Sequence, residues 1–230
     1  MMYADVSKDR IKSLIKLPVI FPIASIEQHS SHLPLGTDAF ILNSLIEKLE
    51  DTASEKVIIL PTEWIGFAEE HHGFPGTLSL SRVTLSSLLS DLTKWLEMSG
   101  FEKLVIVNSH GGNLDPLNEF EKHYRGAMKL KNYDVWGTSD ELTIKLFGGI
   151  DEHAGDSESS VLRAVRPDLA VEGTIKKGYV ARKPHVHEYP GFVLSDNGVL
   201  NFKPDIAVSQ KKGRELLEHM SRSLNAFVLS

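Results

Sequence analysis

Short apolar runs alternate along the chain with longer segments whose apolar residues recur every three or four positions. The short runs predict buried β-strands over residues 18–25, 57–60, 103–107 and 133–136. The longer segments predict amphipathic helices between these strands. Strands that alternate with helices favour a mostly parallel sheet with helices on both faces, so we expect an α/β fold.

The helix predicted over residues 83–99 has the clearest pattern, and Gly100 follows it as the residue that ends the helix. Thr37 is predicted to cap a helix over residues 38–49. Further helices are expected after the loop 108–113 and over residues 141–147, 157–165 and 211–229. The segment 172–205 is rich in Gly, Pro and charge, and we expect it to form a lid or an interface arm.

The composition argues against several classes of function. The 230 residues fit a single domain over residues 1–230, and the net charge of −6 comes without a basic stripe, so nucleic-acid binding is not expected. The absence of Cys excludes disulfides and thiolate metal sites. No apolar stretch reaches the about 20 residues of a membrane span, and the first ten residues lack a signal-peptide pattern. We therefore expect a cytoplasmic protein that does not bind membranes.

The first polar motif, residues 25–38, follows the first predicted strand. Glu27 and His29 are two positions apart, so in an extended chain both side chains point to one side. Asp38 begins a helix, where a carboxylate is favoured. Metal binding competes here with a simpler interpretation, in which Asp38 caps its helix and Glu27 is solvated. Gln28 is expected to be structural, and His32 to lie at the surface or behind the site.

Two further motifs carry candidate residues. One follows the third predicted strand, and the other lies at the start of a predicted helix. His110 is followed by Gly111 and Gly112, which allow a ligand to sit close to the backbone, although the motif also fits a plain glycine turn. Asp151, His153 and Glu158 surround the start of the helix over residues 157–165. A cap formed by Ser157 or Asp156 would account for the acids there, but it would not account for His153 or Gly155.

The segment 69–80 combines acids, histidines and a tight turn. His71 and His72 are adjacent and must face different ways, so we expect at most one of Glu70, His71 and His72 to contact a substrate. The turn at residues 74–77 would bring backbone N–H groups to the rim of a pocket. His185 and His187 are expected to lie in a surface loop rather than in a metal site.

Together these motifs resemble the creatininase (creatinine amidohydrolase) family, which includes archaeal formamidopyrimidine deformylases and the mycofactocin-maturation peptidase. The resemblance spans about 130 residues and rests on the segments 25–29 (SIEQH), 33–38 (LPLGTD), 74–77 (FPGT), 109–113 (SHGGN) and 151–155 (DEHAG). It implies a three-layer αβα sandwich and two divalent metal ions, zinc, manganese or iron. It also implies a homo-oligomer, often a hexamer.

The resemblance also implies which residues would bind the two metals. Glu27, Asp38 and His110 would hold one metal, and His29 with a bridging Asp38 would hold the other. Creatinine-hydrolysing members complete the second site with a glutamate at the position of Gly112. Without it the second metal would have too few ligands. Our hypothesis is that Glu158 replaces that glutamate.

The expected activity is two-metal hydrolysis of a non-peptide C–N bond in a small-molecule amide. His153 would carry the proton to the leaving nitrogen, oriented by Glu152 or Asp151. Gly149 stands where creatinine-hydrolysing members have a tryptophan, so creatinine is not the expected substrate. A formyl amide, as in the deformylase branch, and a non-catalytic metal- or nucleotide-binding assembly subunit are the alternatives. The residues expected to contact substrate are Glu70, His71, Gly76, Thr77, Gly111 and Gly112.

Overall fold

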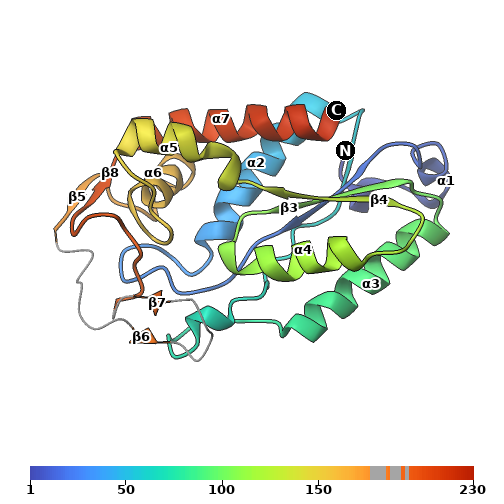
Figure 1. The fold of residues 1–230 in the computed structure, drawn as a ribbon. Helices are drawn as coiled ribbons and strands as arrows, with labels where there is room; N and C mark the ends of the chain where they lie inside the picture. The colour runs from blue at the N-terminus through green and yellow to red at the C-terminus, as the bar shows by residue number, and fades with distance from the viewer. Residues whose placement is uncertain (177–184, 187–192, 195–196) are drawn as a thin grey trace.

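The protein is built around one parallel sheet, seen in a computed structural model that describes residues 1–176, 185–186, 193–194 and 197–230 (Figure 1). The sheet has the strand order β2-β1-β3-β4, and every neighbouring pair is parallel. Its strands are β1 (Val19–Ile23), β2 (Ile58–Ile59), β3 (Lys103–Asn108) and β4 (Lys129–Asp134). The first three predicted strands are confirmed.

The fourth strand was predicted too late in the chain. β4 ends at Asp134, whereas the prediction began at Tyr133. The strand lies at the edge of the sheet, where only Leu130 and Tyr133 are buried and lysines alternate with them. The continuous apolar signal at Val135 and Trp136 belongs to the turn that follows the strand.

Helices cover both faces of the sheet and complete a three-layer αβα sandwich (Figure 1), as predicted. One layer contains α2 (Thr37–Ala53), α5 (Asp140–Phe147), α6 (Asp156–Val165) and α7 (Gln210–Leu229), and the other contains α3 (Arg82–Met98) and α4 (Leu114–His123). Shorter elements are η1 (Tyr3–Asp5), α1 (Lys8–Ile11), η2 (Glu69–His71), η3 (Gly111–Asn113) and η4 (Gly137–Ser139). Two small antiparallel pairs join β5 (Gly173–Ile175) to β8 (Ile206–Val208) and β6 (His185–Val186) to β7 (Val193–Leu194).

The buried strands divide the core into two halves. Side chains of β3 alternate between them: Val105 faces the core formed with α2, α6 and α7, and Leu104 and Ile106 face the core formed with α3. A strand buried on both faces needs apolar residues at successive positions, which explains the uninterrupted apolar runs in the sequence.

The ends of two helices test the capping predictions. Gly100 has a φ of 91° and follows α3, as predicted. Thr37 does not cap α2: it is the first helical residue, and its hydroxyl donates to the Pro34 carbonyl at 2.7 Å. The residue before the helix is Gly36, which has no side chain for capping. The carboxylate of Asp38 is therefore available for another role.

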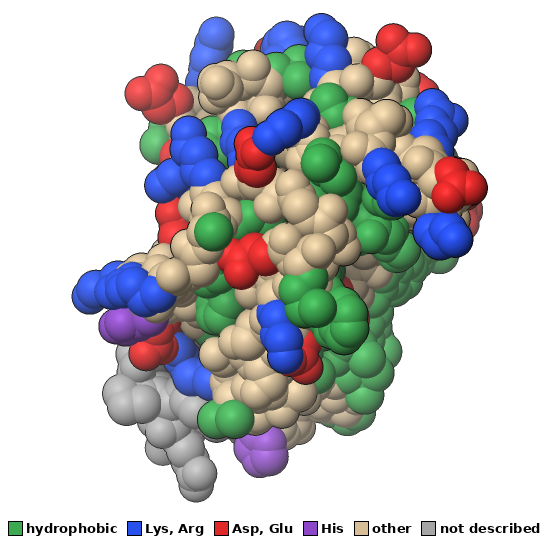
Figure 2. Space-filling model, turned by 90° about the vertical axis from the view of Figure 1, so that its right-hand side faces the viewer, with side chains coloured by type: hydrophobic (Ala, Val, Ile, Leu, Met, Phe, Trp, Pro, Cys, Tyr) green, Lys and Arg blue, Asp and Glu red, His purple; other side chains and the backbone are tan. Residues whose placement is uncertain are grey.

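Figure 2 shows the right-hand end of the molecule in Figure 1, near α1 and the end of α3. Lysine and arginine side chains are interspersed there with aspartate and glutamate and with small apolar areas. Among the described helices, none combines the length and the apolar content that a membrane crossing requires.

Candidate metal centre

The polar motifs meet beyond the carboxyl ends of β1 and β3, the position where ligands bind in open α/β sheets. Glu27 and His29 follow β1, and His110 follows β3; each is at most 4% exposed. Asp38 and Glu158 come from the first turns of α2 and α6. The interpretation of Glu27 as a solvated residue is therefore wrong.

Two residues beside the site have unusual backbone conformations. Ser30 has a φ of 59° and Ala154 a φ of 52°, in the left-handed region that non-glycine residues rarely adopt. Each follows a buried histidine of the site, His29 and His153. Such a conformation costs of order 1–3 kcal/mol and persists where the surroundings enforce it.

Three buried histidines share one arrangement, in which one ring nitrogen faces a backbone carbonyl. In His29, Nδ1 lies 3.1 Å from the Glu27 carbonyl. In His110, Nε2 lies 3.0 Å from the Phe67 carbonyl, and in His153, Nε2 lies 2.8 Å from the Gln28 carbonyl. A carbonyl can only accept, so these nitrogens carry the hydrogen. In the neutral ring the other nitrogen would then hold a lone pair, which is the state a metal ligand requires.

Those lone pairs face buried carboxylates. Nδ1 of His110 lies 2.9 Å from Glu27 Oε2 and 3.4 Å from Asp38 Oδ2. Nε2 of His29 lies 3.3 Å from Glu158 Oε1 and 3.5 Å from Asp38 Oδ1. Asp38 thus stands between the two histidines, with one oxygen toward each.

The carboxylates are poorly satisfied by the protein. Both oxygens of Glu27 and Oδ2 of Asp38 are buried and have no hydrogen-bond partner among the described residues. A buried carboxylate oxygen without a partner is costly, and a cation would remove that cost. These orphaned atoms are the physical signature of a cation site.

The electrostatics of the metal-free cage point the same way. Burial alone would raise the pKa of Glu27, but His110 and His71 hold that pKa well below its usual range. Burial alone would lower the pKa values of His29 and His110, but the adjacent carboxylates raise both well above their usual range. Without metal, protons on the histidines supply the positive charge that the carboxylates require.

The donor set fits two divalent cations. The ligand atoms of Glu27, Asp38 and His110 all lie within 4.8 Å of one another, and so do those of His29, Asp38 and Glu158. The two groups share Asp38. Mixed imidazole and carboxylate donors suit zinc, manganese and iron.

His153 lies beside these groups, and its ring centre is 4.5 Å from that of His29. Burial, followed by the nearby His29 and His71, lowers the pKa of His153 to about 3. The expectation that Glu152 or Asp151 orients the His153 ring is wrong, because the Gln28 carbonyl holds the ring. Glu152 is exposed.

Asp151 has a different task from the one expected. Its carboxylate accepts the Ser157 N–H at 3.1–3.2 Å and caps α6. The expected capping by Ser157 or Asp156 is therefore wrong, and Asp156 instead pairs with Lys203 at 2.5 Å. Burial raises the pKa of Asp151 to about 6.

A cavity of about 360 Å³ opens onto the cage. Gly111 lines it, together with the apolar side chains of Leu114, Trp136 and Ile150. Four carboxylates outside the cage also line it, from Asp134, Asp140, Asp151 and Glu152, and none of its described lining residues is Lys or Arg.

The remaining residues expected to contact substrate are not among those that line this cavity. Glu70 and His71 lie beside Glu27, with His71 Nε2 3.1 Å from Glu27 Oε1. His72 is exposed, so the two adjacent histidines do face different ways. Thr77 receives the Gln28 N–H on its hydroxyl at 3.1 Å, and Gly76, with a φ of 90°, packs against Leu35. Gly112 packs against Glu70.

Gln28 has a larger role than the sequence indicated. Its Oε1 accepts the Ser30 N–H at 2.9 Å, so its Nε2 is the donor. That nitrogen lies 2.9 Å from His71 Nδ1 and 3.0 Å from the Gly198 carbonyl. His71 therefore accepts at Nδ1 and carries its hydrogen on Nε2, toward Glu27. The alternation of Gln28 away from Glu27 was the available signal, but its partners are 43 and 170 residues away.

Two other histidine predictions concern the surroundings of the site. His32 is half-buried behind it, with Nε2 3.1 Å from the Ser159 hydroxyl. His187 and most of the central part of the segment 172–205 lie outside the described residues.

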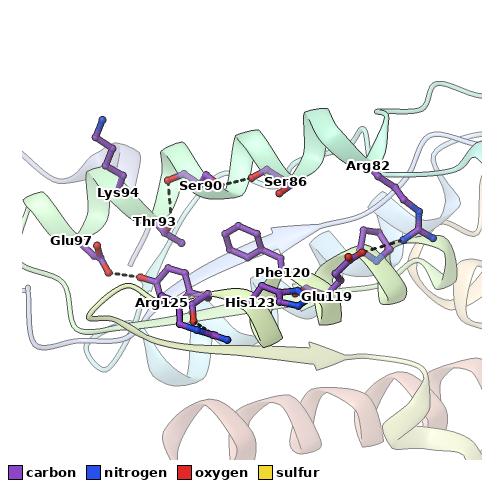
Figure 3. Close-up of a pocket in the computed structure, with 12 residues that line it drawn as sticks. Arg82, Ser86, Ser90, Thr93, Lys94, Glu97, Glu119, Phe120, His123 and Arg125 are labelled. Carbon is purple, nitrogen blue, oxygen red and sulfur yellow. Dashed lines mark hydrogen bonds and ion pairs between the residues drawn. The ribbon is translucent and has the colours of Figure 1, made fainter.

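A larger cavity, about 480 Å³, lies between α3 and α4 (Figure 3). Its polar groups pair with one another: Tyr124 donates to Glu97, and Arg82 lies 3.9 Å from Glu119. The candidate metal-binding groups among the described residues all lie elsewhere. Among the described residues, the cage is therefore a stronger candidate for the functional site than this groove.

Fold and site together define an α/β protein with a buried cluster of aspartate, glutamate and histidine that could hold metal ions. The chain belongs to the creatininase family: the family model described as creatinine amidohydrolase matches residues 5–228. The fold agrees, because the crystal structure of creatinine amidohydrolase (creatininase) superposes with a TM-score of 0.74 at 20% identity, covering 99% of this chain and 96% of that one.

Curated relatives have several different names. The mycofactocin precursor peptide peptidase of Mycolicibacterium smegmatis is 33% identical over 65% of this chain and 58% of its own length. The creatinine amidohydrolase of Pseudomonas putida is 25% identical over 66% of this chain and 65% of its own length. A formylamino-ribosylaminopyrimidinone monophosphate deformylase of Methanobrevibacter smithii is 30% identical over 65% of this chain and 60% of its own length. The matches thus span about three fifths of the length of these relatives.

Proposed function

We propose that this protein is a metal-dependent amidohydrolase that cleaves a non-peptide C–N bond in a cyclic amide or formamide with an activated water. The observation that carries the proposal is the cage itself, in which ring lone pairs of His29 and His110 are turned toward carboxylates with unpaired oxygens. A solved relative described as "Creatininase Mn" supports a metal in this fold.

The proposed roles follow from the contacts. Glu27, Asp38 and His110 would hold one ion, and His29, Asp38 and Glu158 would hold the second. Bound ions would supply Lewis acidity, which acidifies water and polarises the carbonyl. Glu158 is the proposed third ligand of the second ion, because its Oε1 faces His29 while its Oε2 accepts the Ala154 N–H at 2.6 Å.

His153 is the proposed proton carrier to the leaving nitrogen. Its Nε2–H is fixed on the Gln28 carbonyl, so Nδ1 is the nitrogen that exchanges protons. Its low pKa keeps the ring neutral at pH 7, so a proton that it takes up during the reaction would be passed on readily.

The lining of the cavity favours an amide without a phosphate. Its carboxylates outside the cage would repel a phosphate, and its described residues offer no Lys or Arg to pair with one. The relatives' names include creatinine amidohydrolase and a nucleotide monophosphate deformylase. Of these two substrate classes, the lining supports an uncharged or basic small amide.

The test is a substrate panel of lactams, cyclic guanidines and formamides, with and without a 5′-phosphate. The protein is loaded with Zn²⁺ or Mn²⁺, its metal content is measured, and ammonia, formate and ring-opened product are quantified. Release of a product from at least one phosphate-free amide, abolished by a chelator and restored by metal, is expected. A fully loaded protein with no turnover would instead favour the non-catalytic binding or assembly role.

We also propose that the chain forms a homo-oligomer, possible sizes including a hexamer. Trp95 and Met98, one turn apart on α3, are 64% and 67% exposed, which is unusual for large apolar side chains. Light scattering coupled to gel filtration measures the mass, and a monomeric mass at micromolar concentration would contradict this proposal.

A further inference from the structure

Glu70 is a buried carboxylate that neither ligand set uses. It lies in η2 and is 5% exposed. Its Oε1 lies 3.1 Å from Nε2 of His110, on the side of the ring opposite the lone pair at Nδ1. This oxygen has no hydrogen bond among the described residues. Glu70 therefore stands behind a proposed metal ligand, away from the cavity.

Gly112 provides the space for this carboxylate. A Cβ at position 112 would lie 1.9 Å from Glu70 Oε1, 2.5 Å from His110 Nε2 and 2.6 Å from the Phe67 carbonyl oxygen. Any side chain there would displace Glu70, His110 or both. The absence of a side chain at Gly112 thus leaves room for a carboxylate from another segment of the chain.

Glu70 could instead be a ligand in a third group, because Glu27, Glu70 and His71 also bring their donor atoms within 4.8 Å of one another. The hydrogen positions argue against this alternative. Nδ1 of His71 accepts from Gln28, so Nε2 carries the hydrogen and offers no lone pair toward Glu70. That Nε2 also lies 4.0 Å from Glu70 and 3.1 Å from Glu27.

We propose that Glu70 is a positioning residue that holds His110 through its Nε2–H and makes Nδ1 a stronger metal ligand. The proposal rests on the metal centre proposed above. The Nε2–H of His110 makes its hydrogen bond to the Phe67 carbonyl at 3.0 Å, and the Glu70 carboxylate lies 3.1 Å from the same nitrogen as a charge that attracts it. A carboxylate behind a ligand histidine fixes its tautomer and raises its basicity, which a neutral carbonyl does less strongly.

The experiment measures metal affinity, so it does not depend on knowing the substrate. Zn²⁺ and Mn²⁺ are titrated against a competing chelator into the full chain and into the Glu70→Gln and Glu70→Ala variants. We expect affinity at one of two sites to fall about 10–100-fold, with two ions still bound at saturation and Gln milder than Ala. Glu69→Gln, a half-exposed neighbour on the same turn, is the matched control and should bind like the unchanged chain.

A pair of glycine variants tests the same contact from the other side. Gly112→Ala should reproduce the affinity loss of Glu70→Ala, whereas Gly111→Ala should retain metal, because a Cβ at position 111 meets nothing within 4 Å. Circular dichroism and thermal melting check that each variant folds. Should Gly112→Ala fail to fold, the Glu70 variants still decide the question.

The possible negative results distinguish a failure of the positioning role of Glu70 from a failure of the proposed metal centre. Unchanged affinity in Glu70→Ala would overturn the positioning role and leave the metal centre intact. Loss of one whole equivalent at saturating metal would make Glu70 a ligand and also overturn it. If the unchanged chain bound no divalent ion, the proposed function itself would be wrong.

Discussion

Glu27 shows how the site depends on single hydrogen positions. Its two oxygens face His110 Nδ1 and His71 Nε2, at 2.9 and 3.1 Å. In the neutral rings the first of these nitrogens would have a lone pair and the second a hydrogen, as their other contacts indicate. Glu27 Oε1 then faces an N–H without making a hydrogen bond to it, and Oε2 faces a lone pair and is left for a cation.

At the same scale, His153→Ala should separate binding from catalysis. The residue belongs to neither proposed ligand set, so both ions should remain bound. Turnover on any substrate found in the panel should fall about 10²–10⁴-fold, the usual contribution of a general acid–base group. Elemental analysis and initial rates are the two measurements. Full activity in His153→Ala would remove this residue from the mechanism.

The sequence predicted which residues gather at the centre, but not the hydrogen bonds that orient them. The spacing of Glu27 and His29 and the place of His110 after a strand are local features that a sequence displays. The roles of Gln28 and Asp151 depend on which carbonyls and N–H groups the fold brings beside them. Asp151, six residues before Ser157, could not be identified as the cap of α6 from spacing alone.

Among the elements, α6 must be placed most accurately, because it supplies Glu158. Its first turns are buried. It packs closely against α7 at Gly213, where a Cβ would lie 1.8 Å from the Ser160 carbonyl oxygen. The close approach of the two helix backbones fixes the position of α6 against α7. Helical periodicity predicted both helices, but periodicity contains no information about which faces touch.

Gly213→Ala therefore tests this packing. In an exposed helix interior the substitution would stabilise by about 1 kcal/mol, through propensity alone. Here the clash with backbone should outweigh that gain and destabilise the protein by roughly 1–3 kcal/mol. Urea unfolding measures the change, and Arg214→Ala, at the next and exposed position, is the control. A more stable Gly213→Ala would mean that the helices separate easily.

For the whole molecule, the sandwich brings four distant segments to one end of the sheet. Residues 27, 70 and 110 come after β1, β2 and β3, and residue 153 precedes α6; the parallel order β2-β1-β3-β4 brings the ends of the strands to one edge. The fold class followed from alternation of strands and helices. The edge strand β4 was misplaced because an edge is only half-buried and its apolar pattern is weak.

Because the cage joins the sheet to α2 and α6, metal should stabilise the fold. At free metal about 100 times the dissociation constant, each site adds about 2.7 kcal/mol, which for a chain of this size raises Tm by roughly 5–10 °C. Removal of metal with a chelator should reverse the gain. Differential scanning calorimetry with Zn²⁺, Mn²⁺ and chelator measures it, and Mg²⁺, which prefers oxygen ligands, is the control.

The stabilisation by metal should also depend on pH, with a definite sign. Without metal, the raised pKa values of His29 and His110 contribute stability that is present below their unfolded value of 6.5 and is lost as pH rises through the higher folded values. Metal must displace these protons, so it competes poorly in acid and well in alkali. The difference in Tm between metal-loaded and metal-free protein should therefore widen from pH 6 to pH 9. A difference that stays constant across this range would show that the ions do not bind through the two histidines.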